Sequence, residues 1–570
     1  MSEAATTHSD TPASPTLGTR LPSLEEAGFE TLEEKRPPGL IRRLLVTQRH
    51  TLGLAAGGLI DWVRTRRPED RQGFTFRIRQ LVSVFARLLV APSYARQPFP
   101  VQLRRRLEGL GPTYIKLGQI LSLRQDLLPR AITDELKRLL DRLPALPYER
   151  FLELVAQGLR RPVDEAFSWI EPVPLGSASI AQSHRATTRD GEPVVLKVVK
   201  PGNRKLFERD AVLLRALALV LQFFLPRYQP RPTVREFLRY TRREFDLQRE
   251  ADHSETFAAN FRDEPDVRFP RIHRELSSKS VLCMELFEGH RPDSPEAQEL
   301  DEEAKDRVID LGAGAIVRML YRDGFFHADL HPGNLIILPG PQAGFIDLGM
   351  VGRLDDGVRR TLLYYYYSLA AGDAKTAARY LCNLAKVDSR GDLDGFRRDV
   401  EDLARRWRQN ATFENFSLGR LILESVGLSG EHGIYFPVEM VLISKALVTF
   451  EGVGHQLKPG FDVAAVTKRH VGQVILQQLS PLRLARDGLR GAPEVLDALV
   501  KTPLLVSEGL RLLEDTTKRS GENPFAGIRG TLFGGFCLVA GAISSASGGP
   551  WPLWTTLFVV GLLTALNPRR

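Results

Sequence analysis

Two aspartates and one asparagine lie close together in the middle of this chain of 570 residues. Asp329 belongs to the segment FHADLHPGN, and Asn334 follows it by 5 positions. Asp347 opens the tripeptide Asp-Leu-Gly 13 residues after Asn334. Carboxylate and amide oxygens are the ligands that Mg²⁺ prefers, so Asn334 and Asp347 are candidate metal ligands. The pattern predicts a site that holds Mg²⁺ beside a phosphate-bearing cofactor.

This spacing is typical of the catalytic loop of kinases, where an Asp precedes an Asn by five positions and a second Asp opens a motif ending in Gly. It predicts that Asp329 orients the attacking hydroxyl or water, with ATP or ADP as the cofactor. Apolar runs at 335–338 and 345–346 predict two short strands joined by a turn at 339–341. Both metal ligands would then lie at strand ends.

Two other interpretations of this segment stay open. A pattern of the HxDxH type is, by itself, an ordinary polar loop. His327 and His331 also raise the possibility of zinc, although Pro332 and Gly333 favour a tight turn and no cysteine lies nearby in the sequence. We interpret the two histidines as orienting or structural residues.

A lysine inside an apolar run, Lys197 in Val194–Val199, predicts a buried strand that carries a cation. A lysine is costly to bury among valines, so we expect an anionic partner. In kinases such a lysine contacts the α and β phosphates and pairs with a helix glutamate. We select Glu250 as that glutamate, on one helix predicted over 234–261; a surface ion pair is the alternative.

The segment 174–182 precedes this strand where a kinase has its GxGxxG loop, and it keeps only Gly176. Fewer backbone NH groups can then approach phosphates closely. The other candidate nucleotide contacts in this loop are Ser177, Ala178 and Ser179. No Ala-Pro-Glu follows Asp347 at the usual distance, since the tripeptide begins only at Ala492. Both departures disfavour a protein acceptor and favour a small substrate or ATP hydrolysis.

Positive charge is concentrated near the N-terminus. The net charge is +9, and residues 41–110 hold fourteen arginines against four acidic residues. Within this range, apolar residues at steps of three and four predict a helix with one apolar stripe and one cationic side. The stripe consists of Phe74, Ile78, Leu81, Val82, Phe85, Leu88 and Leu89. We favour contact with a membrane surface; packing against the catalytic body is the alternative, and no aromatic stacking pattern supports nucleic acid.

Residues 530–568 contain no Asp, Glu, Lys, Arg or His. Two apolar stretches there, 531–547 and 551–566, approach the length of about 17–25 residues that crosses a bilayer. Arginines flank both ends of this apolar region, so the positive-inside rule places both ends in the cytoplasm. We expect a transmembrane helical hairpin whose glycines also permit self-association. A hairpin buried in protein is the alternative.

Residues 110–119 read LGPTYIKLGQ and place Lys116 and Gln119 on one helix face. With Glu244-Phe245-Asp246 as an ExD motif, the HADLHPGN loop and the apolar C-terminal pair, the chain closely resembles the UbiB family of atypical kinase-like proteins from about residue 100 to 570. The resemblance implies a kinase-like fold with ATPase activity, membrane attachment and a role in ubiquinone biosynthesis. It also implies that the KxGQ extension packs over the site where a protein substrate would bind.

The resemblance further implies that Lys116 and Gln119 reach the active site, with Glu244 and Asp246 as partners. Because helix residues two apart point to nearly opposite sides, we expect Glu244 to be the partner of Lys116. Three positions depart from the family pattern, and none removes a charged catalytic group. They are Gly176 in place of a frequent alanine, Ser183 in place of valine, and Leu348 in place of phenylalanine.

We therefore expect an α+β, bilobal protein-kinase-like fold with an N-terminal helical KxGQ extension and a C-terminal transmembrane helical hairpin. The expected divisions are a disordered leader (1–40), a basic segment with the KxGQ extension (41–165), an N-lobe (166–290), a helical C-lobe (291–515) and the hairpin (530–567).

The expected function is that of a membrane-anchored atypical kinase or ATPase on the cytoplasmic face of a bacterial inner membrane. The expected partners are membrane lipids, prenylated quinone precursors and proteins of quinone biosynthesis, without nucleic acid. Two alternatives remain: a nonenzymatic, nucleotide-switched scaffold, and a small-molecule phosphotransferase of the aminoglycoside or choline type.

Overall fold

The computed structural model divides the chain into two units, Met1–Ile475 and Leu476–Arg570. Apart from a few isolated positions, it describes residues 38–66, 74–87, 96–122, 128–139, 144–224, 229–387, 391–409, 418–461, 469–474, 528–546 and 550–566. Most of the expected leader and the tripeptide at Ala492 lie outside these residues, as does the end of the expected C-lobe.

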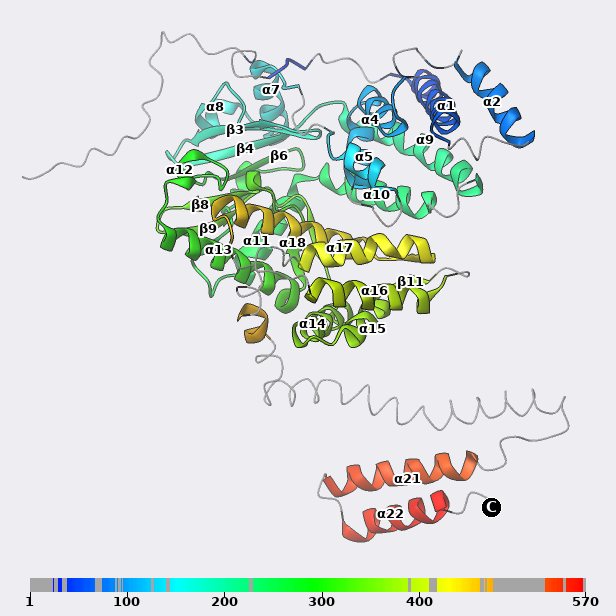
Figure 1. Ribbon diagram of the computed structural model, residues 1–570. Coiled ribbons are helices and arrows are strands. Elements are labelled where there is room, and N and C mark those ends of the chain that lie inside the picture. Colours follow the sequence, from blue (N-terminus) through cyan, green and yellow to red (C-terminus); the bar gives the residue numbers. More distant parts are fainter. Residues whose placement is uncertain are drawn as a thin grey trace, which may run out of the picture. The chain divides into compact units, whose positions relative to one another are not determined.

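An antiparallel sheet forms the core of the N-lobe, with the strand order β1-β3-β4-β6 and β2 paired to β3 (Figure 1). The strands are β1 (Phe167–Ile170), β2 (Gly176–Ser177), β3 (Ala181–Thr188), β4 (Pro193–Val199) and β6 (Val281–Glu285). Val194, Leu196 and Val198 pack in the core formed with α7 (Tyr148–Leu159) and α8 (Val163–Ala166). Because side chains alternate along a strand, Lys197 points to the opposite face.

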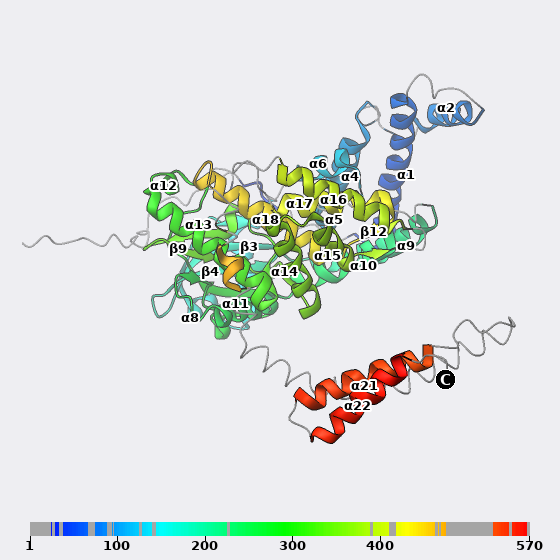
Figure 2. The same cartoon turned by 60° about the horizontal axis from the view of Figure 1, so that its bottom comes forward.

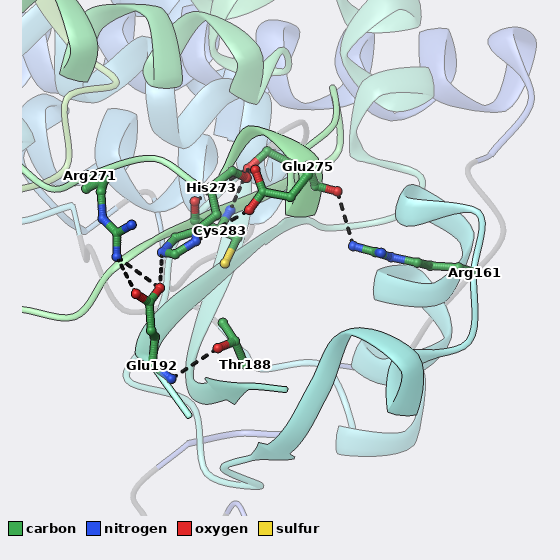
Figure 3. Close-up of polar contacts among 8 residues, drawn as sticks. Arg161, Thr188, Glu192, Arg271, His273, Glu275 and Cys283 are labelled. Atoms are coloured by element: carbon green, nitrogen blue, oxygen red, sulfur yellow. Dashed lines mark hydrogen bonds and ion pairs between the residues drawn. The ribbon is translucent and has the colours of Figure 1, made fainter. Parts of the chain in front are cut away.

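A polar cluster connects the turn between β3 and β4 to the segment before β6 (Figure 3). Arg271 forms two 2.9 Å contacts with the carboxylate of Glu192, in the turn between β3 and β4. The buried ring of His273 lies 3.6 Å from the same carboxylate, and its backbone NH donates to the carbonyl of Cys283. The cluster ties the segment before β6 to the sheet and contains none of the predicted site residues.

Helices from two distant parts of the sequence form one helical subdomain. Its helices are α4 (Phe99–Leu110), α5 (Pro112–Ser122), α6 (Arg130–Leu136), α9 (Asn203–Phe224) and α10 (Pro230–Glu244). Tyr114 from α5 shares one buried cluster with Phe207 from α9 and Phe237 from α10. The KxGQ extension therefore packs against the insertion that follows β4.

The prediction of one helix over 234–261 is wrong, because α10 ends at Glu244 and α11 (Leu247–Asn260) begins after Asp246. Phe245 is buried in the helical subdomain, with its ring centroid 5.3 Å from that of Phe207. α11 instead packs on the N-lobe sheet, where Leu247 and Ala251 contact Leu282. The chain must turn between the two helices because they belong to different cores.

Helix α1 (Leu40–Thr65) contacts α9 and α4, and α2 (Phe74–Ala86) lies beside α1 (Figure 2). The predicted apolar stripe of α2 is exposed along its described length, from 45% at Ile78 to 78% at Phe74. The alternative prediction, that this stripe packs against the catalytic body, is therefore wrong for the described residues. Leu88 and Leu89 lie outside the described residues.

The C-lobe is mainly helical and surrounds one large apolar cluster. Its helices are α12 (Pro295–Gln298), α13 (Glu302–Val317), η5 (Arg318–Asp323), α14 (Asp356–Ala371), α15 (Ala374–Leu384), α16 (Leu393–Gln409), α17 (Leu418–Ser429) and α18 (Val438–Leu457), with the short turns η6 (Pro332–Asn334) and η7 (Gly430–His432). The turn η4 (Arg274–Leu276) instead precedes β6, and its Leu276 packs in the N-lobe core. Its strands, with β5 joining from the preceding segment, are β5 (Val267–Arg268), β7 (Phe325–His327), β8 (Leu335–Leu338), β9 (Gln342–Phe345), β10 (Val351–Arg353), β11 (Lys386–Val387) and β12 (Ile434–Tyr435). The predicted hairpin is present as β8 and β9, although β9 begins at Gln342 and ends at Phe345 rather than spanning 345–346. Strand β7 pairs with β10.

In the second unit, α21 (Ile528–Ala546) packs against α22 (Trp551–Leu566). Glycines allow the close approach: a Cβ added at Gly561 would lie 2.9 Å from the carbonyl oxygen of Gly534. The expected pair of packed helices is thus present. No helix among the described residues, however, combines the length and the apolar character needed to cross a membrane. The predicted transmembrane character of the hairpin therefore has no support from the structure.

We predict that Arg43→Met destabilises the first unit strongly. Arg43 on α1 binds the fully buried carboxylate of Asp210 on α9 at 2.6 Å, and also donates to the carbonyl of Leu110. Loss of one partner leaves a buried charge uncompensated, which costs about 3–5 kcal/mol. Urea unfolding followed by circular dichroism measures the effect. The control is Arg42→Met, which removes an exposed arginine of the same helix; equal unfolding midpoints would contradict the prediction.

Candidate active site

Lys197 stands at the centre of the candidate site. Its Nζ lies 2.8 Å from Oε1 of Glu250 and 3.0 Å from Oδ1 of Asp347. The three residues come from β4, α11 and the segment after β9. The ion pair between Lys197 and Glu250 that the sequence predicted is present. The second contact of Lys197, with Asp347, connects the N-lobe sheet to the start of the Asp-Leu-Gly tripeptide.

Burial and neighbouring charge act in opposite directions on these three groups. Burial opposes the charge of Lys197, but Asp347 and Glu250 outweigh it and hold the pKa of the lysine above its ordinary value. Burial likewise opposes ionisation of Asp347, but Lys197 holds the pKa of that carboxyl well below its usual range. Burial raises the pKa of Glu250 despite the adjacent lysine. Lys197 and Asp347 are therefore charged at neutral pH.

Asp347 has a backbone φ of +53°, in the left-handed region. Asp tolerates this region better than most residues, and such strain often occurs at functional sites. Leu348 is buried in the C-lobe core, and its carbonyl accepts a 2.9 Å hydrogen bond from His253 on α11. Leu348, which replaces the phenylalanine of the family pattern, is therefore a core residue.

The catalytic loop is held by its own side chains. His327 is fully buried: its Nε2 binds the carbonyl of Ile346 at 3.1 Å, and its Nδ1 accepts from the backbone NH of Asp329 at 3.1 Å. Asn334 donates from Nδ2 to the carbonyl of Asp329 at 2.9 Å. Both nitrogens of His327 are therefore engaged, and burial lowers its pKa. The ring orients the loop, as we interpreted it, and its bonds leave no nitrogen for zinc.

Sequence reasoning missed Lys445. This residue lies on α18, and its Nζ is 2.6 Å from Oδ1 of Asp329. Burial opposes ionisation of Asp329, but Lys445 outweighs it and lowers the pKa of the carboxyl. The signal was available: Lys445 is the one lysine in the apolar run 440–450, the same pattern that identified Lys197.

The lysine of the KxGQ motif also reaches this region. Lys116 on α5 lies 2.9 Å from Oε2 of Glu244, the last residue of α10. Burial opposes its charge, but Glu244, with smaller contributions from Asp329 and Asp347, raises its pKa. The expected choice of Glu244 over Asp246 agrees with this contact, since Asp246 stands in the turn after α10. Gln119 lies on the same helix, three residues further on.

The small-residue loop forms hydrogen bonds with the segments before and after it. The hydroxyl of Ser177 donates to the carbonyl of Pro144 at 3.0 Å and accepts from Nζ of Lys200 at 2.7 Å. The backbone NH of Ala178 donates to the carbonyl of Ala181, while Ser179 accepts from Asn203 through its own carbonyl. Gly176 pairs with Ser183 across the β2–β3 hairpin. The Ser177 side chain therefore has a structural role, and burial lowers the pKa of Lys200 to about 8.

The residues present fit a magnesium nucleotide. The backbone NH of Ile346, directly before Asp347, donates to the carbonyl of Asn334, so the two oxygen-bearing side chains come from adjoining backbone. Among the described residues, no group of three or more His, Cys, Asp or Glu is placed to hold a metal ion. A Mg²⁺ ion held by one or two protein oxygens commonly takes its remaining ligands from phosphates and water.

Comparison with known proteins places this chain among kinase-like proteins. The model of the ABC1 atypical kinase-like domain matches residues 138–381, and that of the UbiB helical domain matches residues 408–462. A probable protein kinase UbiB of Azotobacter vinelandii is 30% identical over 491 residues, which cover 84% of this chain and 90% of the relative. The chain belongs to the UbiB family of atypical kinase-like proteins.

Other relatives include an uncharacterized protein of Synechocystis, 31% identical over 73% of this chain and 71% of its own length. The chloroplastic protein activity of BC1 complex kinase 7 of Arabidopsis thaliana is 30% identical over 71% of this chain and 59% of its own length. Lys197 and Asp329 lie in the matched kinase-like domain, whereas Lys445 lies in the UbiB helical domain. The candidate active site of this UbiB-family protein thus combines residues from both domains.

We predict that Lys445→Met shifts the acid limb of the pH profile of ATP turnover to higher pH. The lysine lowers the pKa of Asp329, so its loss leaves burial unopposed and the carboxyl protonates at a higher pH. Lys445→Arg keeps the positive charge and should keep the acid limb near its original position. The measurement is kcat/KM from about pH 3 to 8, because the pKa of Asp329 in the wild type lies below its ordinary value of 3.8. One common acid limb for all three proteins would refute the role of Lys445.

Proposed function

We propose that this UbiB-family protein is an atypical kinase or ATPase that binds ATP or ADP with Mg²⁺ and supports the biosynthesis of ubiquinone or a related prenylated quinone. The observation that carries the proposal is the arrangement of Lys197, Glu250 and Asp347, with Asp329 on the adjoining loop. Lys197 binds the phosphates, Asn334 and Asp347 hold the metal, and Asp329 orients the nucleophile. Bound Mg²⁺ neutralises charge that develops on the transferred phosphoryl group.

We further propose that the acceptor is water or a small molecule. The side chains of Lys116 on α5 and Lys445 on α18 lie near the acidic groups of the site. An extended peptide acceptor would have to displace both elements. The absence of an Ala-Pro-Glu motif at the usual distance after Asp347 supports the same conclusion. Lys116 and Gln119 then contribute to holding the nucleotide from the side of the KxGQ helix.

A bacterial inner membrane is the proposed location, with membrane lipids and prenylated quinone precursors as partners. Support comes from α2, which exposes Phe74, Leu81 and Phe85 beside Arg77 and Arg79. A helix with one apolar and one cationic side is suited to lie in the interface of an anionic membrane. The apolar helices α21 and α22 are the second proposed point of attachment, together with self-association through their glycines.

We predict that Asp347→Asn lowers magnesium-dependent ATP turnover at least about 100-fold, because it removes the charged ligand proposed for the metal. The matched control is Asp134→Asn, which alters an exposed aspartate of α6. Purified protein is assayed for phosphate release with and without Mg²⁺. Equal turnover by the wild type and Asp347→Asn would overturn the proposed ATP chemistry.

Lipid profiling of a deletion strain completes this test. Expression of the wild type and Asp134→Asn should restore the quinone pool, whereas Asp347→Asn and Asp329→Asn should not. Restoration by Asp329→Asn together with failure of Asp347→Asn would favour the nonenzymatic scaffold, because only nucleotide binding would then be needed. An unchanged quinone pool in the deletion strain would contradict the proposed role in quinone biosynthesis.

We predict that replacing Phe74, Leu81 and Phe85 together with serine weakens binding to anionic vesicles at least about 10-fold, because apolar burial in the interface is lost. The matched control replaces three exposed apolar residues of the C-lobe, Tyr367, Val387 and Leu393. Sedimentation with vesicles of phosphatidylglycerol and phosphatidylcholine measures the bound fraction. An equal loss in both triple variants would show that α2 has no special role.

A further inference from the structure

A pocket of about 660 Å³ lies beside α9 and α10, outside the candidate active site. Both helices belong to the helical subdomain and lie side by side (Figure 1). Eight arginines and one lysine line the pocket, with one aspartate, Asp246, among the described lining residues. None of Lys197, Asp329 and Asp347 lines it. We refer to this feature as the arginine pocket.

Four of the five arginines of α10 form a stripe along one side of the helix. They occur at steps of four, four and three, at Arg231, Arg235, Arg239 and Arg242. Residues at such steps share a helix face. The opposite side of α10 is buried, with Phe237 in the core of the subdomain. On α9, Arg204 and Arg215 are eleven residues, or about three turns, apart and also line the pocket.

Nearby acids offset only part of this positive charge. Glu208 binds Arg242 through two hydrogen bonds of 2.7 and 2.9 Å. Glu236 approaches Arg239 at 3.6 Å, and Asp246 approaches Arg249 at 4.0 Å. Nine cationic side chains thus face three acids in and around the pocket. Like charges at such spacing destabilise a helix, so the stripe opposes the stability of free α10.

We propose that the arginine pocket binds a ligand with clustered phosphate groups, such as a diphosphate or polyphosphate. The planar guanidinium group donates two parallel hydrogen bonds to phosphate, which makes arginine the preferred residue for this recognition. The volume of the pocket falls within the range of about 300–1,000 Å³ that is common for small-molecule sites. The proposal is independent of the proposed function, because it uses none of the catalytic residues.

The pocket adjoins the segment that carries both glutamates of the active site. Phe245 and Asp246 line it, directly after Glu244, the partner of Lys116, and shortly before Glu250, the partner of Lys197. Its rim includes the exposed side chain of Leu219. An apolar group attached to the phosphates would contact this rim, so the source of the ligand is either a free phosphate compound or a lipid headgroup.

Two probes with the same charged group distinguish these sources. Isothermal titration calorimetry measures binding of inorganic pyrophosphate and of geranyl diphosphate to the full chain. We expect both probes to bind with affinity that falls as salt increases. Geranyl diphosphate that binds at least about 10-fold more tightly assigns the pocket to a lipid diphosphate, since a buried apolar tail adds affinity. Similar affinities assign it to a soluble phosphate compound. If neither probe binds, the proposal is overturned.

A triple variant tests the location of the site. Replacing Arg231, Arg235 and Arg239 with glutamine should weaken binding of the tighter probe at least about 10-fold. The matched control replaces three exposed arginines outside the pocket, Arg262, Arg360 and Arg398, with glutamine and should retain the affinity. Because the first change also relieves repulsion on α10, its thermal midpoint should not fall, which separates lost binding from misfolding. Equal affinity of the two triple variants would refute the assignment to the pocket.

Discussion

The contact of one partly buried lysine with two carboxylates sets the geometry of the whole catalytic region. Lys197 is held 2.8 Å from Glu250 and 3.0 Å from Asp347, so β4, α11 and the segment after β9 must meet at one point. A lysine in an apolar strand is unstable unless anionic groups compensate its charge. Compensation of this one positive charge therefore holds the N-lobe sheet and the C-lobe loop together. The same lysine keeps Asp347 ionised.

A second constraint comes from the helical subdomain. The segments that contain Tyr114 and Phe237 are far apart in the sequence, yet they share one buried cluster with Phe207. This common core fixes the end of α10, where Glu244 meets Lys116, and it also places the arginine stripe on the outer side of the same helix. The helical subdomain thus relates the KxGQ motif, the ExD motif and the arginine pocket through packing alone.

Much of the catalytic loop could be predicted because its spacing is local. The separation of Asp329, Asn334 and Asp347 along the chain is short, and the β8–β9 hairpin between them is specified by apolar runs and a turn. The Lys197–Glu250 pair was also predictable, because a lone lysine in a strand demands a partner. Lys445 was missed although it gave the same signal, since a helix more than 110 residues beyond Asp329 has no local relation to the loop. The role of the loop at Ser177 was equally hidden, because Lys200 and Pro144 meet it only after folding.

The sequence by itself determined the membership in the UbiB family, the kinase-like chemistry expected of the loop residues and the separate character of the apolar tail. These features depend on residue types and short spacings, which are the same however the chain packs. The tertiary structure alone decided that the helix over 234–261 is broken at Phe245, that Lys445 faces Asp329 and that the arginines of α9 and α10 line one pocket. Each of these depends on which distant apolar faces are buried together, and a pattern of residues along the chain does not specify that choice.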